Sequence, residues 1–375
     1  MVRCTPLPRG PQSASPTPGS APKLDRASYS FLARLLHRLA LGSDVVAGAS
    51  FEVERLIFGR ELKIRSDAEH VFVVGLARAG TTLLMRLLFE TGQFCSLTYR
   101  DMPFVLAPNL WNAASAGSRR TMAPTGRAHG DGILVDFDSP EALDEVFWRV
   151  FSGNRYIAGD RLRRMRADDE TIENFRLYVE LIMRRYKSDR YLSKNNNNIL
   201  RIDDLLRSFP RATIFVPFRS PVQQAHSLLD QHRRFVANQK RDPFTLRYMT
   251  WLVHHEFGAD HRPFDLEIET SGTGGDAERI DYWLMQWIAA YRYLLREIRS
   301  NPNSLIPISY ERLCGDTERV WGAVCRRTKI RAEPIGGKIA DRTGEIVHDA
   351  HPGNVEASCE IYDGMTELSN AWLSS

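Results

Sequence analysis

The sequence predicts an α/β fold, in which helices cover both faces of a mostly parallel central sheet. Short apolar runs alternate with segments of helical periodicity from residue 71 to about residue 330, which is the pattern of strand–helix–strand units. The first run, residues 71–74, is apolar throughout, as is typical of a strand buried on both faces. A glycine-bracketed loop and an apolar helix follow it directly. We therefore expect a three-layer αβα sandwich with helical insertions.

The loop after this first strand has the features of an anion site. Gly75 and Gly80 bracket it, and Thr81 and Thr82 open the next helix, where free backbone N–H groups and the positive helix end face a bound anion. The glycine spacing makes the predicted fold P-loop-like. A P-loop nucleoside triphosphatase needs a lysine after the second glycine, whereas this chain has Thr81 there and carries its cation earlier, at Arg78. We expect a phosphate-like group to bind; the alternative is a plain strand–turn–helix.

Composition places the chain among ordinary globular proteins. Its 375 residues suffice for one large α/β domain with extensions or for two domains. Hydrophobic residues make up 43% and charged residues 26% of the chain, both within the usual range. The net charge of +4 is small for this length and argues against a dedicated nucleic-acid binder.

Cysteine usage and hydropathy set the expected location. The five cysteines form no CxxC pair and are odd in number, which argues against a zinc site or a disulfide framework. No apolar stretch reaches the roughly 18 residues of a spanning helix, and the first 25 residues hold no apolar signal segment. We expect no metal, no membrane span and a reducing, cytoplasmic compartment.

Four segments are expected along the chain. Residues 1–25 are rich in Pro, Ser and Gly and should be disordered. Residues 26–69 carry helical spacing and should form a helical extension packed on the main domain, with a membrane-surface helix as the alternative. Residues 70–335 form the main α/β domain. Residues 336–375, where the periodicity weakens, are expected to be a C-terminal extension packed on it.

Several elements of the main domain are predicted from local pattern. Residues 94–99 read as a second strand, and Ser139, followed by Pro and Glu, reads as a helix start. Residues 212–218 form another strand, whose pairing should stop at Pro217. Residues 240–280 read as a polar connection.

Active sites of such sheets lie beyond the carboxyl ends of the strands, and the predicted strand ends carry cations, hydroxyls and few acids. These residues are Arg78, Thr81, Thr82, Arg100, Asp101, Lys194, Arg219, Ser227, Tyr310 and Glu311. An anionic cofactor with two separated phosphate groups fits such a set.

Three motifs in this set resemble those of the sulfotransferase family. Arg78-Ala79-Gly80-Thr81-Thr82 resembles the 5′-phosphosulfate loop of that family, usually written RSGTT. Arg219-Ser220-Pro221 with Ser227 resembles its 3′-phosphate motif, and residues 309–313 resemble its tyrosine–glutamate turn. The resemblance covers roughly residues 70–330 and is closest to the broad branch with tyrosylprotein and many bacterial sulfotransferases.

The resemblance implies transfer of a sulfuryl group from 3′-phosphoadenosine 5′-phosphosulfate (PAPS) to a hydroxyl or amine, in line and without a metal. It implies that the loop binds the 5′-phosphosulfate through Arg78, Gly80, Thr81, Thr82 and its backbone N–H groups. Ala79 replaces the usual serine and leaves the backbone cradle intact.

The same resemblance supplies the second anchor of the donor. Arg219 forms a fork to the 3′-phosphate and Ser227 donates a hydrogen bond to it, and Tyr310 is the third donor-binding residue on this side. This anchor distinguishes the donor from ATP.

The catalytic residues are left with alternatives. Asp101 corresponds to the base of the related branch, but a salt bridge or a helix cap explains it equally well. His129 is the rival base, because the cytosolic branch uses a histidine. Lys194 is the candidate for stabilising the bridging oxygen, with a solvated surface lysine as its alternative. Asn195–Asn198 are either turn residues or acceptor-binding amides.

The acceptor is expected to be a small molecule, a glycan or a lipid. Two other functions compete with sulfuryl transfer: a P-loop nucleotide kinase or NTPase, and a non-catalytic nucleotide-binding domain of the same fold. Thr81 in place of the lysine argues against the first of these.

Overall fold

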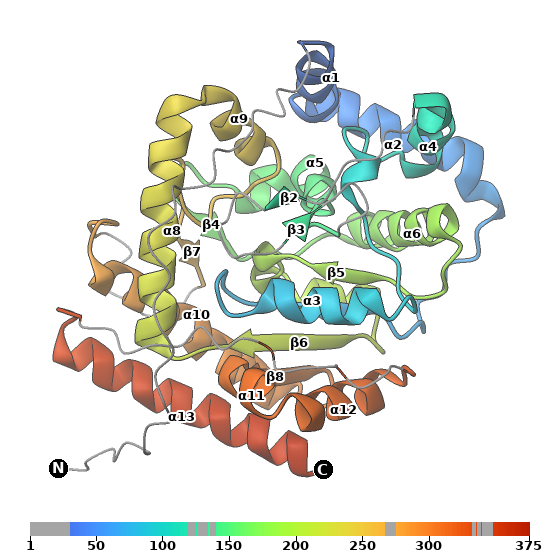
Figure 1. Cartoon of the computed structure of the whole chain (residues 1–375). Helices are drawn as coiled ribbons and strands as arrows, with labels where there is room; N and C mark the ends of the chain where they lie inside the picture. Colours follow the sequence, from blue (N-terminus) through green and yellow to red (C-terminus); the bar gives the residue numbers. More distant parts are fainter. Residues whose placement is uncertain are drawn as a thin grey trace.

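A four-stranded sheet lies at the centre of the molecule (Figure 1), in the order β5-β1-β6-β8. The computed structural model describes residues 31–118, 125–126, 134–135, 140–266, 275–331, 335, 339 and 348–375. The strands are β1 (Val71–Val73), β5 (Leu192–Lys194), β6 (Thr213–Phe218) and β8 (Leu305–Ser309). All neighbouring pairs in this sheet are parallel, so the carboxyl ends of its strands meet at one edge.

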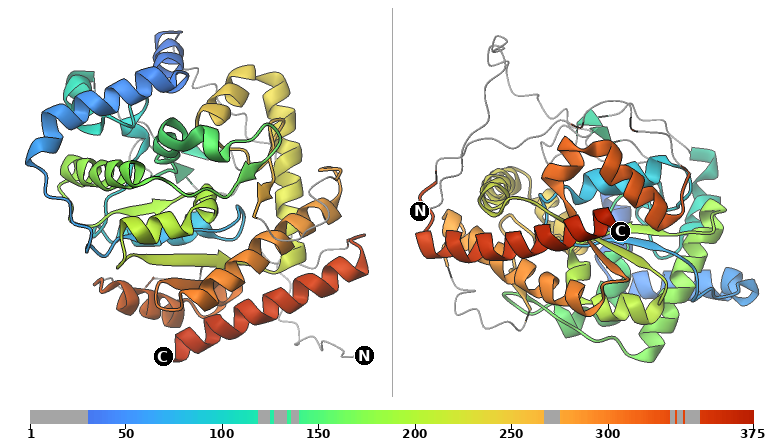
Figure 2. Two further views of the ribbon diagram at one scale, coloured as in Figure 1. Left: turned by 180° about the vertical axis from the view of Figure 1, so that it is seen from behind. Right: turned by 90° about the horizontal axis from the view of Figure 1, so that it is seen from below.

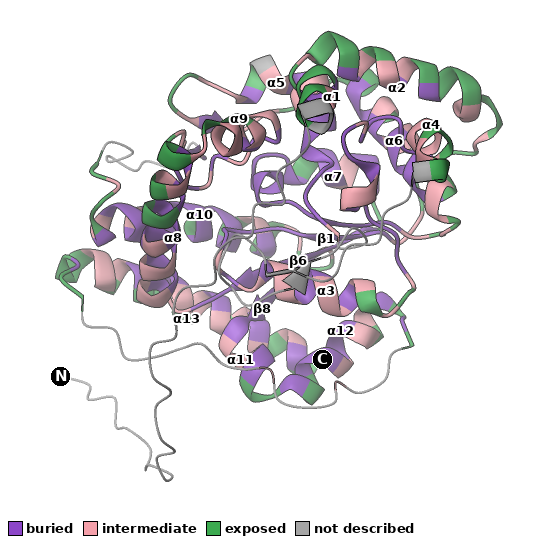
Figure 3. Ribbon diagram, turned by 45° about the horizontal axis from the view of Figure 1, so that its top comes forward, coloured by how far each residue is buried: buried purple, intermediate pink, exposed green. Residues whose placement is uncertain are grey.

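Buried side chains pack on both faces of this sheet. Val71 and Val73 of β1 belong to one cluster and Phe72, between them, to another, because successive side chains of a strand point to opposite faces. The first cluster includes residues of α3 (Thr81–Glu90), α11 (Tyr310–Gly315) and α12 (Thr317–Thr328). The second includes residues of α5 (Glu145–Tyr156), α6 (Asp169–Tyr186), α8 (Pro221–Arg241) and α10 (Ile280–Ser300). The predicted sandwich of helices around a mostly parallel sheet is confirmed, with buried strands at its centre (Figure 3).

Further elements surround these layers. The helices are α1 (Phe31–Leu41), α2 (Asp44–Phe58), α4 (Pro108–Ser115), α7 (Ile202–Ser208), α9 (Pro243–Trp251) and α13 (Pro352–Ser374). Short strands form two more pairs, β2 (Thr125–Gly126) with β3 (Leu134–Val135) and β4 (Leu162–Arg163) with β7 (Phe264–Asp265). In the part of the chain that the structure describes, no helix combines the length and apolar character needed to cross a bilayer.

The helices α1 and α2 lie at the periphery of the molecule, and α2 packs against α4, α5 and α6 (Figures 1 and 3). Glu54 of α2 is buried and accepts hydrogen bonds from the backbone N–H groups of Asn109 (2.8 Å) and Leu110 (3.0 Å). These two donors belong to the first turn of α4, where a carboxylate is favoured. Several large apolar side chains of this segment are exposed: Leu35, Leu39, Val45, Val46, Val53, Leu56, Ile57 and Ile64.

The predicted strand over residues 94–99 is wrong. Cys95 makes a single bridge to Tyr191, Thr98 makes another to Pro140, and the chain then turns into a 3₁₀ helix at Tyr99–Asp101. A capping box accounts for this turn. The Thr98 hydroxyl accepts a hydrogen bond from a backbone N–H of the first turn, and the Asp101 carboxylate accepts one from the Thr98 N–H. The apolar alternation before it did not reveal the cap.

Two other local predictions also fail. The helix predicted to start at Ser139 begins instead at Glu145, and Ser139 itself lies outside the described residues. Pro217 does not end its strand, because it pairs with Ile308 and the register continues to Phe218. The pairing of β6 with β1 has already ended at Phe215, so a missing N–H at Pro217 costs the sheet little.

The chain is also more helical after residue 240 than predicted. Residues 240–280 contain α9 and the short strand β7, and α13 follows the segment where the periodicity weakens. Small residues explain why α13 was missed, since Ser358 and Ser369 are buried and a Cβ on Gly364 would lie 3.2 Å from Leu295. They let α13 pack closely along α10 and β8 (Figure 2) without an apolar stripe.

Candidate functional site

The glycine loop joins β1 to α3 through an unusual backbone. Gly80 is the N-cap of α3 and adopts a left-handed conformation (φ 88°), and Arg78 also has a positive φ of 70°. A Cβ at Gly80 would lie only 2.7 Å from the Tyr310 ring, so both the conformation and the packing require glycine. The strained Arg78 indicates that the surroundings hold this loop in place.

Gln224 of α8 is a main anchor of the loop. Its side-chain amide donates a 2.9 Å hydrogen bond to the carbonyl oxygen of Ala77. Trp287 of α10 donates to the Gln224 carbonyl oxygen at 3.0 Å, and all of these groups are buried. Sequence reasoning missed Gln224; the available signal was a glutamine on the apolar face of a predicted helix.

The two predicted phosphate motifs meet in space. Arg78 Nε donates a 2.9 Å hydrogen bond to Ser227 Oγ on α8, across 149 positions of sequence. Thr81 and Thr82 begin α3 beside the loop, and Ala79 is buried within it. The structure therefore brings together the loop and the serine of the second motif.

Arg219 and Tyr310 complete this side of the sheet edge. Arg219 follows β6 directly and is only 8% exposed. Its guanidinium carbon lies 4.8 Å from the centroid of the Tyr310 ring, a cation–π contact, and its Nη2 donates to Gln223 at 3.2 Å. The Tyr310 ring thus contacts Arg219 and closely approaches Gly80.

Glu311 links the end of β8 to the turn after β6. Its Oε1 accepts a 2.8 Å hydrogen bond from the backbone N–H of Ser220, in the turn between β6 and α8. Its Oε2 accepts from the hydroxyls of Ser309 (3.1 Å) and Tyr362 of α13 (3.2 Å). The carboxylate therefore fixes the turn that carries Arg219 against two other elements.

Lys194 lies at the carboxyl end of β5, in register with Val73 of β1, and is 7% exposed. The alternative of a solvated surface lysine is therefore wrong. It acts electrostatically on His254 and Glu256, which follow α9. A buried cation is thus held at the strand end that is in register with the start of the glycine loop.

Three of the four asparagines after Lys194 hold distant segments together. The amide of Asn195 donates to Glu145 (2.6 Å), that of Asn196 to Glu256 (2.9 Å) and that of Asn197 to the carbonyl oxygen of Val253 (3.0 Å). All are buried, and a 3₁₀ helix begins at Asn196. For Asn195–Asn197 the structure supports turn residues that join distant segments, whereas the buried side-chain amide of Asn198 has no hydrogen-bond partner among the described residues.

A buried ion pair between Arg201 and Glu145 supports this turn. Arg201 makes two 2.9 Å hydrogen bonds to the Glu145 carboxylate, and both side chains are almost fully buried. The Arg201 guanidinium also lies 4.9 Å from the Trp148 ring centroid. The same carboxylate accepts from Asn195, so the pair is linked to the strand end that carries Lys194.

Asp101 is engaged in local structure. It is 1% exposed, and its Oδ2 accepts hydrogen bonds from the Thr98 backbone (2.9 Å) and the Tyr186 hydroxyl (2.5 Å). Arg185 lies 3.7 Å from the other oxygen, and burial raises the pKa of the carboxyl. Tyr186 and Arg185 belong to the last turn of α6. The role of Asp101 as a base stays a prediction. His129, the rival base, lies outside the described residues.

In the described part of the chain, no three His, Cys, Asp or Glu side chains are placed to hold a metal ion together. The site around the glycine loop, Arg219 and Tyr310 instead offers guanidinium groups, hydroxyls and a helix N-terminus. Phosphate and sulfate groups bind to such hydrogen-bond donors. The residues present therefore fit a doubly anionic nucleotide.

Comparisons with solved structures return sulfotransferases. The chain is 12% identical to sulfotransferase STF1 from Mycobacterium tuberculosis, with a TM-score of 0.46 over 92% of this chain and 88% of that one. It is 14% identical to sulfotransferase STF9 from Mycobacterium avium, with a TM-score of 0.44 over 88% of this chain and 75% of that one.

A comparison with curated proteins found no match. A model of the sulfotransferase family matches residues 70–262, which is about half of the chain. The matched region contains the glycine loop, Lys194, Arg219 and Ser227. The chain belongs to the sulfotransferase family.

Proposed function

We propose that this sulfotransferase moves a sulfuryl group from PAPS to a hydroxyl or amine of a small-molecule, glycan or lipid acceptor, in line and without a metal. The observation that carries the proposal is the 2.9 Å hydrogen bond between Arg78 and Ser227. It joins a loop suited to the 5′-phosphosulfate to a motif suited to the 3′-phosphate, and a donor with both groups spans them.

The donor-binding roles follow from chemistry. Backbone N–H groups at the start of α3, with Thr81 and Thr82, bind the 5′-phosphosulfate. Arg219 binds the 3′-phosphate as a fork, and Ser227 donates to the same group. Tyr310 contacts the Arg219 guanidinium, so it holds that side chain toward the nucleotide.

The transfer step needs little covalent chemistry from the protein. The acceptor oxygen or nitrogen forms a bond to sulfur while the bond from sulfur to the 5′-phosphate oxygen breaks, and the acceptor proton leaves to a base. Arg78 and Lys194 offset the charge that develops on the transferred group and the leaving oxygen, so a metal is not required for that purpose. Asp101 and His129 are the bases proposed from the sequence.

Thermal unfolding with nucleotides tests the donor. Adenosine 3′,5′-bisphosphate without metal should raise the melting temperature by a few degrees, since a ligand at about 100 times its Kd stabilises by about 2.7 kcal/mol. Arg219→Ala should abolish the shift. Arg233→Ala, an exposed α8 arginine paired with Glu278, is the matched control and should keep it.

Other outcomes identify the competing functions. Stabilisation only by ATP with magnesium would contradict the proposal and favour a kinase or NTPase. Binding of the bisphosphate without conversion of PAPS to adenosine 3′,5′-bisphosphate, for any acceptor class including water, would favour a non-catalytic domain.

A further inference from the structure

A second group of charged side chains lies beyond the carboxyl end of β5, on the side away from the 3′-phosphate motif. His254 Nδ1 is 3.5 Å from Glu256 Oε1, and the Asn196 amide donates to that oxygen at 2.9 Å. Lys194 and Glu141 also act electrostatically on His254. Sequence reasoning did not single out His254 or Glu256.

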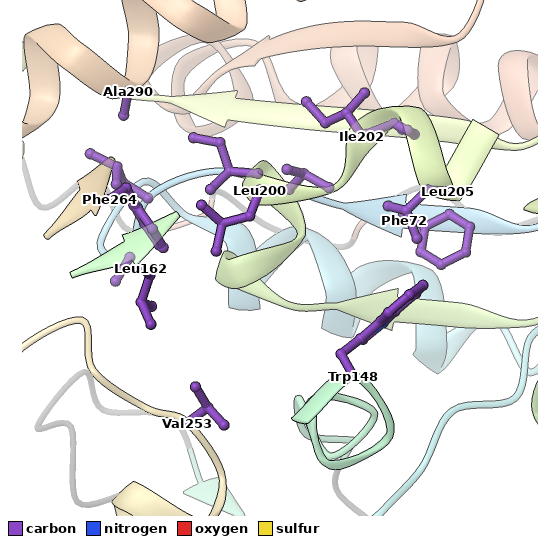
Figure 4. Close-up of a cluster of buried hydrophobic side chains, with 14 of the residues drawn as sticks. Phe72, Trp148, Leu162, Leu200, Ile202, Leu205, Val253, Phe264 and Ala290 are labelled. Carbon is purple, nitrogen blue, oxygen red and sulfur yellow. The ribbon is translucent and has the colours of Figure 1, made fainter. Parts of the chain in front are cut away.

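The backbone before His254 is strained. Val253 has a φ of 55°, a conformation that β-branched residues rarely adopt. Its side chain belongs to the large buried cluster shown in part in Figure 4, and its carbonyl oxygen accepts a 3.0 Å hydrogen bond from Asn197. The next N–H, of His254, donates to Met249 at 2.9 Å. Strain of this kind persists only where neighbours hold it, and it is concentrated at functional sites.

The histidine lies near the expected position of the sulfuryl group. Lys194 is opposite Val73 in the sheet, and the backbone N–H of Asn195 donates to the Val73 carbonyl oxygen at 3.3 Å. The glycine loop begins just beyond Val73, and Lys194 acts electrostatically on both His254 and Glu256. The His254 side chain is 21% exposed, so its ring is not sealed within the core.

We propose that His254, oriented by Glu256, is the base that takes the proton from the acceptor. This inference rests on the proposed function. As the acceptor oxygen or nitrogen bonds to sulfur, its proton passes to His254 Nε2, and the sulfur–oxygen bond to the 5′-phosphate breaks with its electron pair on the phosphate oxygen. Glu256 faces Nδ1 and stabilises the imidazolium that forms, as a carboxylate does beside a catalytic histidine.

The charges around His254 are consistent with this role. Glu256 and Glu141 raise its pKa, whereas burial and Lys194 lower it, and the net direction is upward from the ordinary value. The neutral, proton-accepting ring therefore dominates only above that raised pKa. Asp101 is less suited, because its carboxylate already accepts from Thr98 and Tyr186.

The first test measures proximity to the sulfuryl group without an acceptor. The pKa of His254 is followed by NMR of histidine-labelled protein, with the signal assigned by its loss in His254→Gln. PAPS should raise this pKa above its value with adenosine 3′,5′-bisphosphate, because only PAPS places the sulfonate charge nearby. His226, at the same 3.5 Å from Asp230 but on the exposed face of α8, is the control and should respond equally to both ligands.

The second test measures turnover as sulfate release from PAPS, with water as the acceptor. His254→Gln should lower the rate about 10²–10⁴-fold with the bisphosphate-induced melting shift unchanged, and His226→Gln should have no effect. Glu256→Gln should lower the rate less and move the acidic limb of the pH profile to lower pH, since the ring loses its carboxylate. A purely structural Glu256 would not move that limb.

Two results would overturn the inference: a His254 pKa that is identical with PAPS and bisphosphate, or full turnover in His254→Gln. Failure of the wild-type chain to bind the bisphosphate would instead overturn the proposed function, and this inference with it.

Discussion

The donor and acceptor sides of the same sheet edge are built in different ways. On the proposed donor side, the glycine loop, Arg219 and Tyr310 each follow a strand directly, and the side chains of Gln224 and Glu311 then fix the loop and the turn after β6. On the proposed acceptor side, the turn after Lys194 is held by side-chain hydrogen bonds from Asn195 to Glu145 of α5 and from Asn196 and Asn197 to residues 253–256. The residues of the proposed donor side are thus recognisable as motifs that follow strands, whereas those around Lys194 are related only through the tertiary structure.

The acceptor side should be the more fragile of the two, and Glu145→Ala is the sharpest test. Removing this carboxylate leaves Arg201 buried without its partner, which typically costs about 3–5 kcal/mol. Urea unfolding should show this loss in the free energy of unfolding. The control Glu278→Ala breaks the exposed pair with Arg233 and should cost less than about 1 kcal/mol. Equal losses in the two variants would mean that the buried pair does not support this side.

Gly80→Ala should break the donor side through packing. The new Cβ would lie 2.7 Å from the Tyr310 ring at a φ of 88°, and we expect a cost of roughly 1–3 kcal/mol with loss of bisphosphate binding. Gly92→Ala is the matched control, because Gly92 also has a positive φ (69°) but nothing lies within 4 Å of a Cβ there. Titration calorimetry should find bisphosphate affinity unchanged in Gly92→Ala. If Gly80→Ala also binds normally, the Tyr310 contact is not part of the donor site.

Ser227→Ala should weaken the donor side without unfolding it. The change removes the hydroxyl that accepts from Arg78 and that is proposed to donate to the 3′-phosphate. One such hydrogen bond is worth about 0.5–1.5 kcal/mol, so the Kd for adenosine 3′,5′-bisphosphate should rise about 2- to 13-fold. The Kd for adenosine 5′-monophosphate, which lacks the 3′-phosphate, should change less. Equal changes for both nucleotides would place the serine away from the 3′-phosphate.

The same contrast explains what could be predicted from sequence. The first strand and the glycine loop before α3 were predictable because they form one local pattern of apolar residues and glycines. The roles of Asn195–Asn197 were not, because their partners lie 50, 60 and 56 positions away. His254 could not be recognised from sequence, because its position depends on the backbone conformation of Val253 and on the hydrogen bond from Asn197 to the Val253 carbonyl oxygen. The strand predicted over residues 94–99 was wrong, because the apolar pattern of this stretch does not reveal the capping box that turns the chain at Thr98.

Asp101→Asn separates a cap from a base and should have the smallest effect on stability. Burial raises the pKa of Asp101 in the folded protein, so the native state binds its proton more tightly than the unfolded chain does. The contribution of this carboxyl to stability is therefore largest at low pH and is lost as pH rises from about 3.9, the unfolded pKa, through the folded pKa. The advantage of the wild type over Asp101→Asn in free energy of unfolding should shrink over that range, as measured by urea unfolding at several pH values.

Turnover of the same variant decides the role of this acidic residue. If Asp101 serves as a cap, Asp101→Asn should release sulfate from PAPS at a rate close to that of the wild type, since the asparagine oxygen can still accept from the Thr98 N–H. A loss of about 10²-fold or more with bisphosphate binding retained would make Asp101 the base. It would also contradict the proposal that His254 is the base.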